Sequence, residues 1–431
     1  MNALDFLYAI VGTATAPLWA RKVRGGWGER FGRTAALPEK RRPRVMLHAV
    51  SVGEVNALRT LVPLLTPTLD VVVSATTDTG LARAGELYSK SATVVRYPLD
   101  FSRSVRRFLD AVRPDAVALV ELELWPNFIA QCGRRGISVA VVNGRLSERS
   151  FRGYKKIRVF MRRSFAALRF AAVQDTDYAA RFEFMGVAAG KCLVTGSMKW
   201  DAAPKADAGE TAGVGLGVGL GIGLGEKAER LAAVLGIERG RPLIVAGSTG
   251  PGEEALLHAA CPPEVQLLCA PRKPERFDEA AAALPGCVRR SQRAASVGVA
   301  AAKSDRFLLD SIGELRDAYE LADVVVIGRS FGDLFGSDPV EPVALGRATV
   351  IGPAFEDFLQ SVNALRAAGG IVVSSRESLA DDLARLIADP DRRAAIVQNG
   401  VECVRGQQGA SVRHAELLRA LVSRVGVGSG S

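Results

Sequence analysis

Histidine is scarce in this chain, and the three that occur, His48, His258 and His414, stand far apart among 431 residues. A zinc or iron centre built from clustered histidines is therefore not expected. The six cysteines are also scattered and form no CxxC pair. A chain of this length needs no disulfide framework, so the cysteine pattern indicates a reducing compartment.

The chain also lacks an obvious membrane-spanning segment near its beginning. The uncharged run from Phe6 to Ala20 is shorter than the roughly 20 residues that a spanning helix needs. No basic stretch precedes this run, which is not the charge order of a signal peptide. Trp19 lies near the end of the run and a basic stretch follows at 21–24, so residues 1–24 fit an interfacial membrane anchor. A first helix packed on its own domain is the alternative.

Acidic residues are outnumbered by basic ones, 46 against 56, which gives a formal net charge of +10. No basic tract interleaved with aromatic residues is present, and we find no nucleic-acid-binding module, so we expect no nucleic-acid partner. An anionic membrane surface or a phosphorylated substrate explains the charge equally well.

Apolar strands alternate with helices through most of the chain, which is too long for a single core. This alternation predicts an α/β fold with doubly wound parallel sheets. In residues 213–225 glycine occupies every second position, and we interpret 202–227 as a linker or insert. The expected order is a membrane-associating segment (1–24), an N-terminal domain (25–201), the linker (202–227), a C-terminal domain (228–424) and a disordered tail (425–431).

A polar turn follows the first predicted strand, Val45–Val50, and leads to Glu54. The simplest interpretation is a capping box, in which Ser51 caps a helix and Glu54 completes the box three residues later. The carboxyl end of a strand beside a helix N-terminus is also where open α/β sheets bind ligands. A catalytic role for Glu54 is therefore the second interpretation.

Two carboxylates, Glu121 and Glu123, follow the apolar run Ala116–Val120. In an extended chain residues two apart face the same side, so the two charges lie close together. Such an arrangement raises at least one pKa and is costly without a cationic partner or a function. A salt bridge to a basic helix, such as the one predicted over Phe151–Leu168, is the structural alternative.

The second half of the chain offers groups that suit a nucleotide. The turn Gly247–Thr249 before a helix can bind an anion or simply cap that helix. Arg272 at a strand end presents a forked guanidinium suited to phosphate, or is an ordinary surface arginine. Glu314 and Glu341 lie at loop–helix junctions, where a carboxylate accepts ribose hydroxyls or caps its helix.

Eight motifs in order resemble the 3-deoxy-D-manno-octulosonic acid (Kdo) transferases of lipopolysaccharide synthesis, and together they are highly specific. They are His48–Glu54 (HAVSVGE), Glu121–Asn127 (ELELWPN), Asn143–Ser150 (NGRLSERS), Thr195–Asp201 (TGSMKWD), Gly247–Thr249 (GST), Pro271–Phe277 (PRKPERF), Asp310–Leu315 (DSIGEL) and Glu341–Gly346 (EPVALG).

The resemblance implies a GT-B glycosyltransferase, with two Rossmann-like domains facing across a cleft and no metal or cofactor. It implies inverting transfer of Kdo from CMP-Kdo to a lipid A precursor at the cytoplasmic face of the inner membrane. Glu54 matches the family's general base, and Glu123 and Lys199 match residues that stabilise the transition state. The residues that match the CMP site, in addition to the anion-binding turn Gly247, Ser248 and Thr249, are Pro271, Arg272, Ile312, Gly313, Glu314, Asp338, Pro339, Val340 and Glu341.

The chain departs from the family pattern at three places. Lys273 stands where the family usually has histidine, Gly336-Ser337-Asp338 replaces a Gly-His-Asn segment, and Gly196-Ser197-Met198-Lys199 replaces Gly-Asn-Leu-Lys. These changes leave two alternatives open, a GT-B enzyme with another donor or lipid acceptor and a catalytically inactive membrane-docked paralogue. The intact catalytic set argues against the inactive paralogue.

Overall fold

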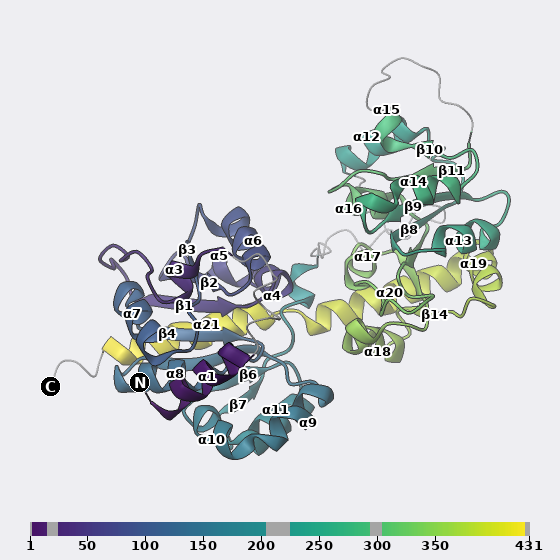
Figure 1. Cartoon of the computed structure of the whole chain (residues 1–431). Coiled ribbons are helices and arrows are strands. Elements are labelled where there is room, and N and C mark those ends of the chain that lie inside the picture. Colours follow the sequence, from purple (N-terminus) through teal and green to yellow (C-terminus); the bar gives the residue numbers. More distant parts are fainter. Residues whose placement is uncertain (1, 15–24, 204–224, 294–303, 427–431) are drawn as a thin grey trace. The chain divides into compact units, whose positions relative to one another are not determined.

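The computed structural model describes residues 2–14, 25–203, 225–293 and 304–426. These residues form two compact units (Figure 1). Unit 1 contains the described residues of Met1–Ala202 and Gln407–Ser431, and unit 2 contains those of Ala203–Gly406. Most of the predicted linker, part of the predicted N-terminal anchor (15–24) and most of the predicted tail lie outside the described residues. Both units are α/β, as predicted.

Unit 1 is built on a seven-stranded parallel sheet with the order β3-β2-β1-β4-β5-β6-β7. Its central strands are valine-rich and buried, as expected for a parallel sheet covered by helices on both faces. The strands are β1 (Arg44–Ala49), β2 (Asp70–Ala75), β3 (Thr93–Arg96), β4 (Ala116–Val120), β5 (Ser138–Gly144), β6 (Ala171–Val173) and β7 (Cys192–Val194).

Helices cover both faces of this sheet and bury separate clusters of apolar side chains. One cluster includes Leu61 and Leu418, and the other includes Phe108, Phe128 and Phe165. The helices of unit 1 are α1 (Ala3–Ala14), α3 (Trp27–Arg30), α4 (Val52–Ala57), α5 (Leu61–Leu65), α6 (Asp78–Tyr88), α7 (Ser102–Val112), α8 (Pro126–Arg134), α9 (Glu148–Lys156), α10 (Arg158–Ala166), α11 (Thr176–Met185), η1 (Trp200–Ala202) and α21 (Ala410–Gly426).

The C-terminal helix α21 belongs to unit 1, whereas the domain predicted from the sequence over 228–424 includes it in the second unit. Leu418 and Leu421 of this helix are buried in the unit-1 core. The Asp201 carboxylate accepts the backbone N–H groups of Gly409 and Ser411, which fixes the start of the helix. The apolar stripe of an amphipathic helix does not specify which of two sheets it covers, so the sequence alone could not assign α21.

Two predicted helices are interrupted in the structure. The helix expected from Asn56 to Leu65 is instead α4 and α5, and α4 begins at Val52, directly after its cap. The basic, aromatic helix expected over Phe151–Leu168 is α9 and α10, which are separated at Ile157.

Unit 2 repeats the architecture with the strand order β10-β11-β9-β8-β12-β13-β14, again all parallel. The strands are β8 (Leu243–Thr249), β9 (Gln266–Pro271), β10 (Val288–Arg289), β11 (Arg306–Leu308), β12 (Val324–Ile327), β13 (Ala348–Ile351) and β14 (Val372–Val373). The helices are α12 (Glu226–Leu235), α13 (Glu253–Ala260), η2 (Pro274–Arg276), α14 (Phe277–Ala282), α15 (Arg290–Arg293), α16 (Leu315–Leu321), α17 (Val340–Ala344), η3 (Glu356–Phe358), α18 (Leu359–Ala367), α19 (Leu379–Ala388) and α20 (Pro390–Gln407).

Each sheet has one point at which successive strands turn away to opposite sides. This switch point lies between β1 and β4 in unit 1 and between β8 and β12 in unit 2. The loops that leave the carboxyl ends of these strands diverge and form the crevice in which open α/β sheets bind ligands. The strand order therefore identifies one candidate ligand site in each unit.

Candidate active site

Glu54 stands at the switch point of unit 1, in the first turn of α4. Ser51 is the N-cap of this helix, and its hydroxyl accepts the Glu54 N–H at 3.5 Å and donates to Glu54 Oε1 at 3.0 Å. The backbone N–H of Val50 donates to Oε2 at 2.8 Å. The predicted capping box is present, with Val50 rather than Ser51 supplying the backbone N–H. The carboxylate is thereby held in one orientation at the end of β1.

Burial raises the pKa of the Glu54 carboxyl. The hydrogen bond from Val50 lowers this pKa, and the neighbouring charge of Glu121 raises it again, so that the pKa is raised overall. A carboxylate with a raised pKa is a stronger base at neutral pH than an ordinary surface glutamate.

Glu123 lies beyond the end of β4, which is hydrogen-bonded to β1. Burial, followed by the charge of Glu54, raises the pKa of Glu123 to about 7. The indole Nε1–H of Trp125 donates to Glu123 Oε2 at 3.1 Å and partly opposes this rise. Glu121, between β4 and Glu123, adopts a left-handed backbone conformation with φ of 59°. The structure therefore brings Glu54, Glu121 and Glu123 together.

No described residue forms an ion pair with Glu121 or Glu123, so the expected alternative of a salt bridge to a basic helix is not seen. The nearby α9 contributes Tyr154 instead. Burial, and then the charge of Glu123, raises the pKa of the Tyr154 hydroxyl. The carboxylates are thus partly buried and close to one another, and no side-chain cation among the described residues pairs with Glu121 or Glu123. Such an arrangement is energetically costly and is expected at a functional site.

Lys199 follows β7, at the edge of the sheet farthest from β3. The loop that carries it is fixed by the Met198 N–H, which donates to Asn143 Oδ1 at 3.0 Å, and by the Lys199 N–H, which donates to Ser197 Oγ at 3.4 Å. The Lys199 side chain is half-buried. No hydrogen bond or ion pair joins it to Glu54 or Glu123 within the described part of the chain.

Asn143, the first residue of one motif, and His414 form a contact at this edge that was not predicted from the sequence. Asn143 is fully buried with φ of 52°, and its N–H donates to His414 Nε2 at 2.8 Å. Because Nε2 accepts, the proton lies on Nδ1 and is donated to the Ala410 carbonyl at 2.6 Å. Burial lowers the pKa of His414 and keeps it neutral. Among described atoms, Asn143 Nδ2 has no partner.

His48, which begins the first motif, is a core residue of β1. Its ring stacks on Tyr97 with centroids 3.7 Å apart, and Nδ1 lies 3.0 Å from Ser74 Oγ. Burial lowers the pKa of His48 to about 3, so the ring is neutral at physiological pH. This position suits packing beneath the site rather than proton transfer.

In unit 2, the predicted turn Gly247–Thr249 forms the end of β8 at the switch point. A Cβ atom on Gly247 would lie 1.9 Å from the Tyr319 hydroxyl, so only glycine fits there. Ser248 adopts φ of 58°, and the Thr249 hydroxyl donates to Glu254 Oε1 at 2.6 Å. The narrow turn is therefore set by the packing of α16 and by a buried carboxylate.

Glu253 is a buried carboxylate whose role was not predicted from the sequence. Its Oε2 accepts the N–H groups of Gly250 at 2.7 Å and Arg329 at 2.6 Å, and its Oε1 accepts those of Ser330 at 2.9 Å and Phe331 at 3.0 Å. These N–H groups lie at the ends of β8 and β12. Glu253 therefore joins the two loops of the switch point and satisfies the N–H groups that a bound anion would otherwise use.

Arg272, Asp338 and Glu341 lie near one another at this edge. The Arg272 N–H donates to the Thr249 carbonyl at 3.1 Å, and its side chain is exposed. Burial, and then the charges of Glu341 and Asp338, raise the pKa of the Tyr319 hydroxyl, whereas the charge of Arg272 lowers it. Tyr319 is thus the common neighbour of all three charged groups.

The other predicted donor residues take up two separate positions. Pro271 ends β9, and Pro339 and Val340 lead into α17, where Asp338 Oδ1 accepts the Val340 N–H at 3.0 Å. Ile312 and Gly313 belong to the loop between β11 and α16.

In that loop Ile312 is 74% exposed and Gly313 has φ of 96°. The Glu314 carboxylate is bound by Arg290, with the Nη2–Oε1 distance at 2.9 Å. Arg290 gave no signal in the sequence.

Comparison with known proteins agrees with the motifs. A family model described as 3-deoxy-D-manno-octulosonic-acid transferase (kdotransferase) matches residues 25–202. The 3-deoxy-D-manno-octulosonic acid transferase of Bordetella pertussis is 32% identical over 423 residues, covering 93% of this chain and 93% of that protein. The chain belongs to the 3-deoxy-D-manno-octulosonic acid transferase family. The Haemophilus influenzae transferase is 28% identical and covers 88% of this chain and 87% of its own length.

Solved structures similar to this transferase show the fold. A glycosyltransferase from Rickettsia africae has a TM-score of 0.58 at 10% identity and covers 89% of this chain and 99% of its own. The UDP-GlcNAc 2-epimerase from Neisseria meningitidis has a TM-score of 0.55 at 12% identity, covering 88% and 100%. The predicted GT-B class and the predicted membership of a glycosyltransferase family are confirmed.

No group of three or more acidic, histidine or cysteine side chains in the described regions is arranged to hold a metal ion. The raised pKa values of Glu54 and Glu123 at the β1–β4 switch point suit acid–base and electrostatic roles.

Proposed function

We propose that this transferase moves Kdo from CMP-Kdo to a lipid A precursor with inversion. The observation that carries the proposal is the pair Glu54 and Glu123, whose pKa values are both raised at the β1–β4 switch point. Two carboxylates in this state suit a reaction in which one takes up a proton and the other stabilises positive charge.

Glu54 is the general base in this mechanism. It takes the proton of the acceptor hydroxyl as that oxygen attacks the anomeric carbon of Kdo, and the bond to CMP breaks on the opposite side. The hydrogen bonds from Val50 and Ser51 hold the carboxylate in position for this transfer. A fixed base avoids the entropy loss of orienting a mobile side chain in the transition state.

Glu123 stabilises the oxocarbenium-like transition state by its negative charge. Because the pKa of Glu123 is about 7, it is mostly ionised above neutral pH. Lys199 supplies positive charge as the phosphate of CMP leaves. This assignment predicts a rate that falls as the pH drops below 7.

The donor site in unit 2 comprises the group around Tyr319 and the loop after β11. Arg272 binds the phosphate of CMP, and Gly247–Thr249 lines the nucleotide at the end of β8. Asp338–Glu341 and Ile312–Glu314 bind the ribose and base. Arg290 holds Glu314 through Oε1 at 2.9 Å, and the Ser311 hydroxyl donates to Oε2 at 2.5 Å, so a ribose hydroxyl would share Oε2 with Ser311.

Contact with an anionic membrane surface at the cytoplasmic face of the inner membrane completes the proposal. Helix α1 is attached to unit 1, since the Asp5 carboxylate accepts the Ser102 N–H at 2.8 Å and the Tyr8 hydroxyl donates to Asp100 at 3.1 Å. Phe6 and Ile10 on the same helix remain 66% and 58% exposed. Both interpretations of the N-terminal segment therefore have support. In the described regions no helix is long and apolar enough to cross a bilayer.

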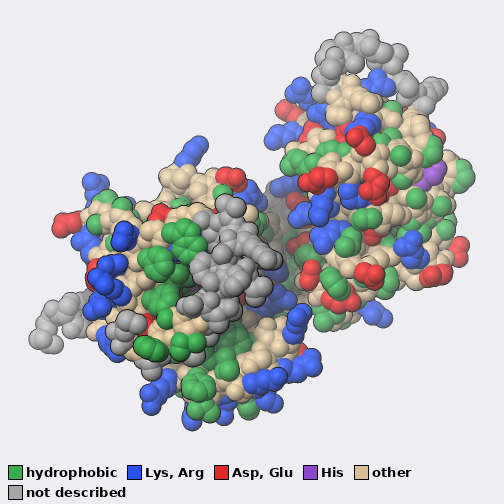
Figure 2. All heavy atoms as spheres, viewed as in Figure 1, with side chains coloured by type: hydrophobic (Ala, Val, Ile, Leu, Met, Phe, Trp, Pro, Cys, Tyr) green, Lys and Arg blue, Asp and Glu red, His purple; other side chains and the backbone are tan. Residues whose placement is uncertain are grey.

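A second apolar patch on unit 1 supports membrane contact. At the start of α10, Val159 is 86% exposed and Phe160 is 78% exposed. Lys156, Arg162 and Arg163 lie within four residues of them and are exposed, and none of these cations forms an ion pair with a described residue. Figure 2 shows hydrophobic and basic side chains gathered along this lower edge of unit 1. Exposed apolar side chains next to unpaired basic ones suit contact with a membrane surface that carries anionic lipid headgroups.

The proposal is tested by mass spectrometry of transfer from CMP-Kdo, generated in situ, to a tetra-acylated lipid A precursor. Glu54→Gln should reduce transfer by about 100-fold or more without lowering the melting temperature, because the base is lost while Gln retains the contact to Val50. Stabilisation of the protein by CMP, but not by UDP or GDP, supports the donor. Preference for another nucleotide would favour the alternative of a related enzyme with a different donor.

A further inference from the structure

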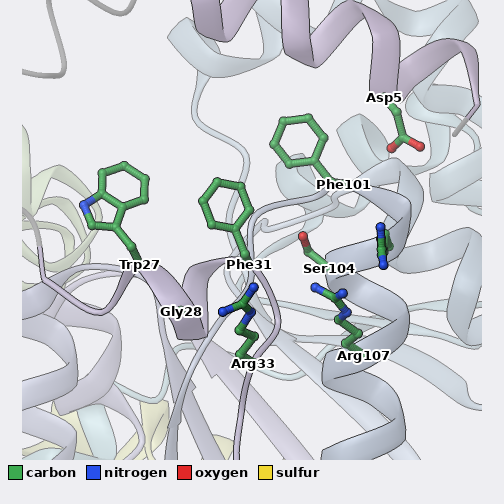
Figure 3. A pocket seen from close by; sticks show the side chains of 9 residues that line it. Asp5, Trp27, Gly28, Phe31, Arg33, Phe101, Ser104 and Arg107 are labelled. Carbon is green, nitrogen blue, oxygen red and sulfur yellow. The ribbon is translucent and has the colours of Figure 1, made fainter.

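A pocket of about 490 Å³ lies in unit 1 between α1, α3 and α7, apart from the carboxylates of the candidate active site. Its volume falls within the usual range for sites of small ligands. Figure 3 shows aromatic rings and guanidinium groups around the same space. The two kinds of group give the pocket an apolar part and a strongly basic part.

The apolar part is a row of three rings. Trp27 and Phe31 stack with centroids 6.1 Å apart and an interplanar angle of 27°, and Phe31 and Phe101 stack at 6.5 Å and 29°. Trp27 and Phe31 nevertheless remain 39% and 44% exposed. The flat faces of this row offer an apolar surface to a hydrocarbon chain.

The basic part consists of Arg33, Arg103 and Arg107. All three side chains are exposed, and none makes a hydrogen bond or ion pair with a described residue. Gly32 determines where Arg33 stands: its φ is 77°, and a Cβ atom there would lie 2.1 Å from the Ser104 carbonyl oxygen. The loop after α3 therefore lies directly on the first turn of α7. The same helix carries the other two arginines, Arg103 and Arg107.

Asp5 also lines the pocket but does not neutralise these arginines. One of its oxygens accepts the Ser102 N–H at 2.8 Å and the Asn127 amide at 3.1 Å, and the other accepts the Asn2 N–H at 2.9 Å. These donors lie outside the arginine group, and the single charge of Asp5 cannot balance three guanidinium groups. The three guanidinium groups leave a local excess of positive charge that an anion would relieve.

We propose that this pocket binds a phosphate group of the acylated acceptor, with the arginines on the phosphate and the aromatic row along an acyl chain. The inference rests on the proposed function and adds to it a subsite for the acceptor. A phosphate beside an aliphatic chain is the chemistry that three unpaired guanidinium groups and an apolar row together recognise.

The position of the pocket agrees with this role. Phe101 ends the loop that leaves the carboxyl edge of β3, and Glu54 follows the same edge of β1. Since β2 alone separates β3 from β1, the two strands lie about 10 Å apart at ordinary strand spacing. Asn127, at the start of the helix that follows Glu123, also hydrogen-bonds to Asp5. One large glycolipid can therefore reach from the pocket toward the carboxylates.

The test uses the full-length protein and the kinetics of transfer. The double variant Arg33→Gln/Arg107→Gln should raise the KM for the acceptor by about 10-fold per arginine, because each loses a charge-assisted hydrogen bond. The kcat at saturating acceptor and the KM for CMP-Kdo should not change. Arg106→Gln is the matched control, since Arg106 is exposed on the same helix but does not line the pocket.

Gly28→Leu provides an independent variant that keeps every arginine. A Cβ atom at Gly28 meets nothing within 4 Å, and Gly28 lines the pocket, so leucine fills the space without a clash at its Cβ atom. We expect the acceptor KM to rise in this variant as well. An acceptor KM equal to that of the control in both variants overturns the proposal.

Two further measurements distinguish binding of the acceptor phosphate from binding of bulk phospholipid. Removal of the acceptor phosphates should weaken binding to the wild type, and it should weaken binding to the double variant by less, because only Arg103 of the three arginines remains. Binding to phosphatidylglycerol vesicles without acceptor should be the same for the double variant and for Arg106→Gln. A loss of vesicle binding in the double variant alone would assign the pocket to bulk phospholipid and overturn the proposal.

Failure of the proposed function gives a different result. If the wild type transfers no Kdo, the proposed reaction fails, and equilibrium binding of intact and dephosphorylated acceptor to the same variants still decides the role of the pocket. Equal binding of both acceptors by the wild type would then refute the subsite.

Discussion

Replacement of Glu123 by glutamine should make unit 1 more stable at alkaline pH while it reduces activity. In the folded chain burial and the charge of Glu54 raise the pKa of Glu123 from the ordinary value of 4.5 to about 7. The folded state therefore holds a proton that the unfolded state releases between these values. The associated stability is fully present below pH 4.5 and is lost as the pH rises through 7.

The magnitude follows from the two pKa values. A shift from 4.5 to about 7 corresponds to about 3 kcal/mol at most, lost between low pH and pH 8. Glutamine carries no charge at any pH and accepts the Trp125 indole N–H through its amide oxygen. Glu123→Gln should therefore match the wild type near pH 4 and exceed its free energy of unfolding by up to about 3 kcal/mol at pH 8.

The assay is chemical unfolding of the full-length protein at pH 5 and pH 8, with Trp fluorescence as the probe of unit 1. Glu39→Gln is the control, because it removes a carboxylate from an exposed position. Transfer by Glu123→Gln should fall by about 100-fold or more, as when an electrostatic stabiliser of a transition state is removed. Lower stability of Glu123→Gln at both pH values would refute the reasoning, since that result is expected of a structural glutamate.

Two further predictions follow from other carboxylate contacts. The indole NMR signal of Trp125 should report the titration of Glu123, with a midpoint of about 7 in the wild type. Glu54→Gln should lower this midpoint, because the charge of Glu54 contributes to the raised pKa of Glu123. An unchanged midpoint would show that the two carboxylates do not interact. Glu253→Gln should destabilise unit 2 by about 2–4 kcal/mol in urea unfolding, because the buried carboxylate accepts four backbone N–H groups and an amide replaces two of those acceptor sites with donors. Wild-type stability of that variant would contradict the bridging role of Glu253.

The alternation of strands and helices is read from the sequence because buried parallel strands are continuous apolar runs. The predicted strand at Val45–Val50 and the observed β1 (Arg44–Ala49) differ by one residue at each end. The two-residue strand β10 (Val288–Arg289) was missed, since a pair of residues carries no periodicity. The assignment of α21 to unit 1 was also beyond the sequence, because it depends on where the chain returns in space.

Some features of the candidate site could likewise be predicted from the sequence, and others could not. The proximity of Glu54 and Glu123 is expected from sequence, because both follow the carboxyl ends of strands and such ends meet at one edge of a parallel sheet. The contact between Asn143 and His414 joins residues 271 positions apart and has no local pattern. The same is true of the ion pair between Arg290 and Glu314. Contacts of this kind arise from packing between distant segments, so no motif records them.

Capping and catalysis are compatible roles for Glu54. Val50 and Ser51 each donate one hydrogen bond, one to each carboxylate oxygen. An ionised carboxylate has about four lone-pair directions, so roughly two remain free to receive a proton. The cap bonds hold the side chain and lower its pKa, and burial more than offsets that effect and keeps the pKa raised. The helix cap therefore orients the base and leaves it basic. A glutamate without these hydrogen bonds would not be held in one orientation.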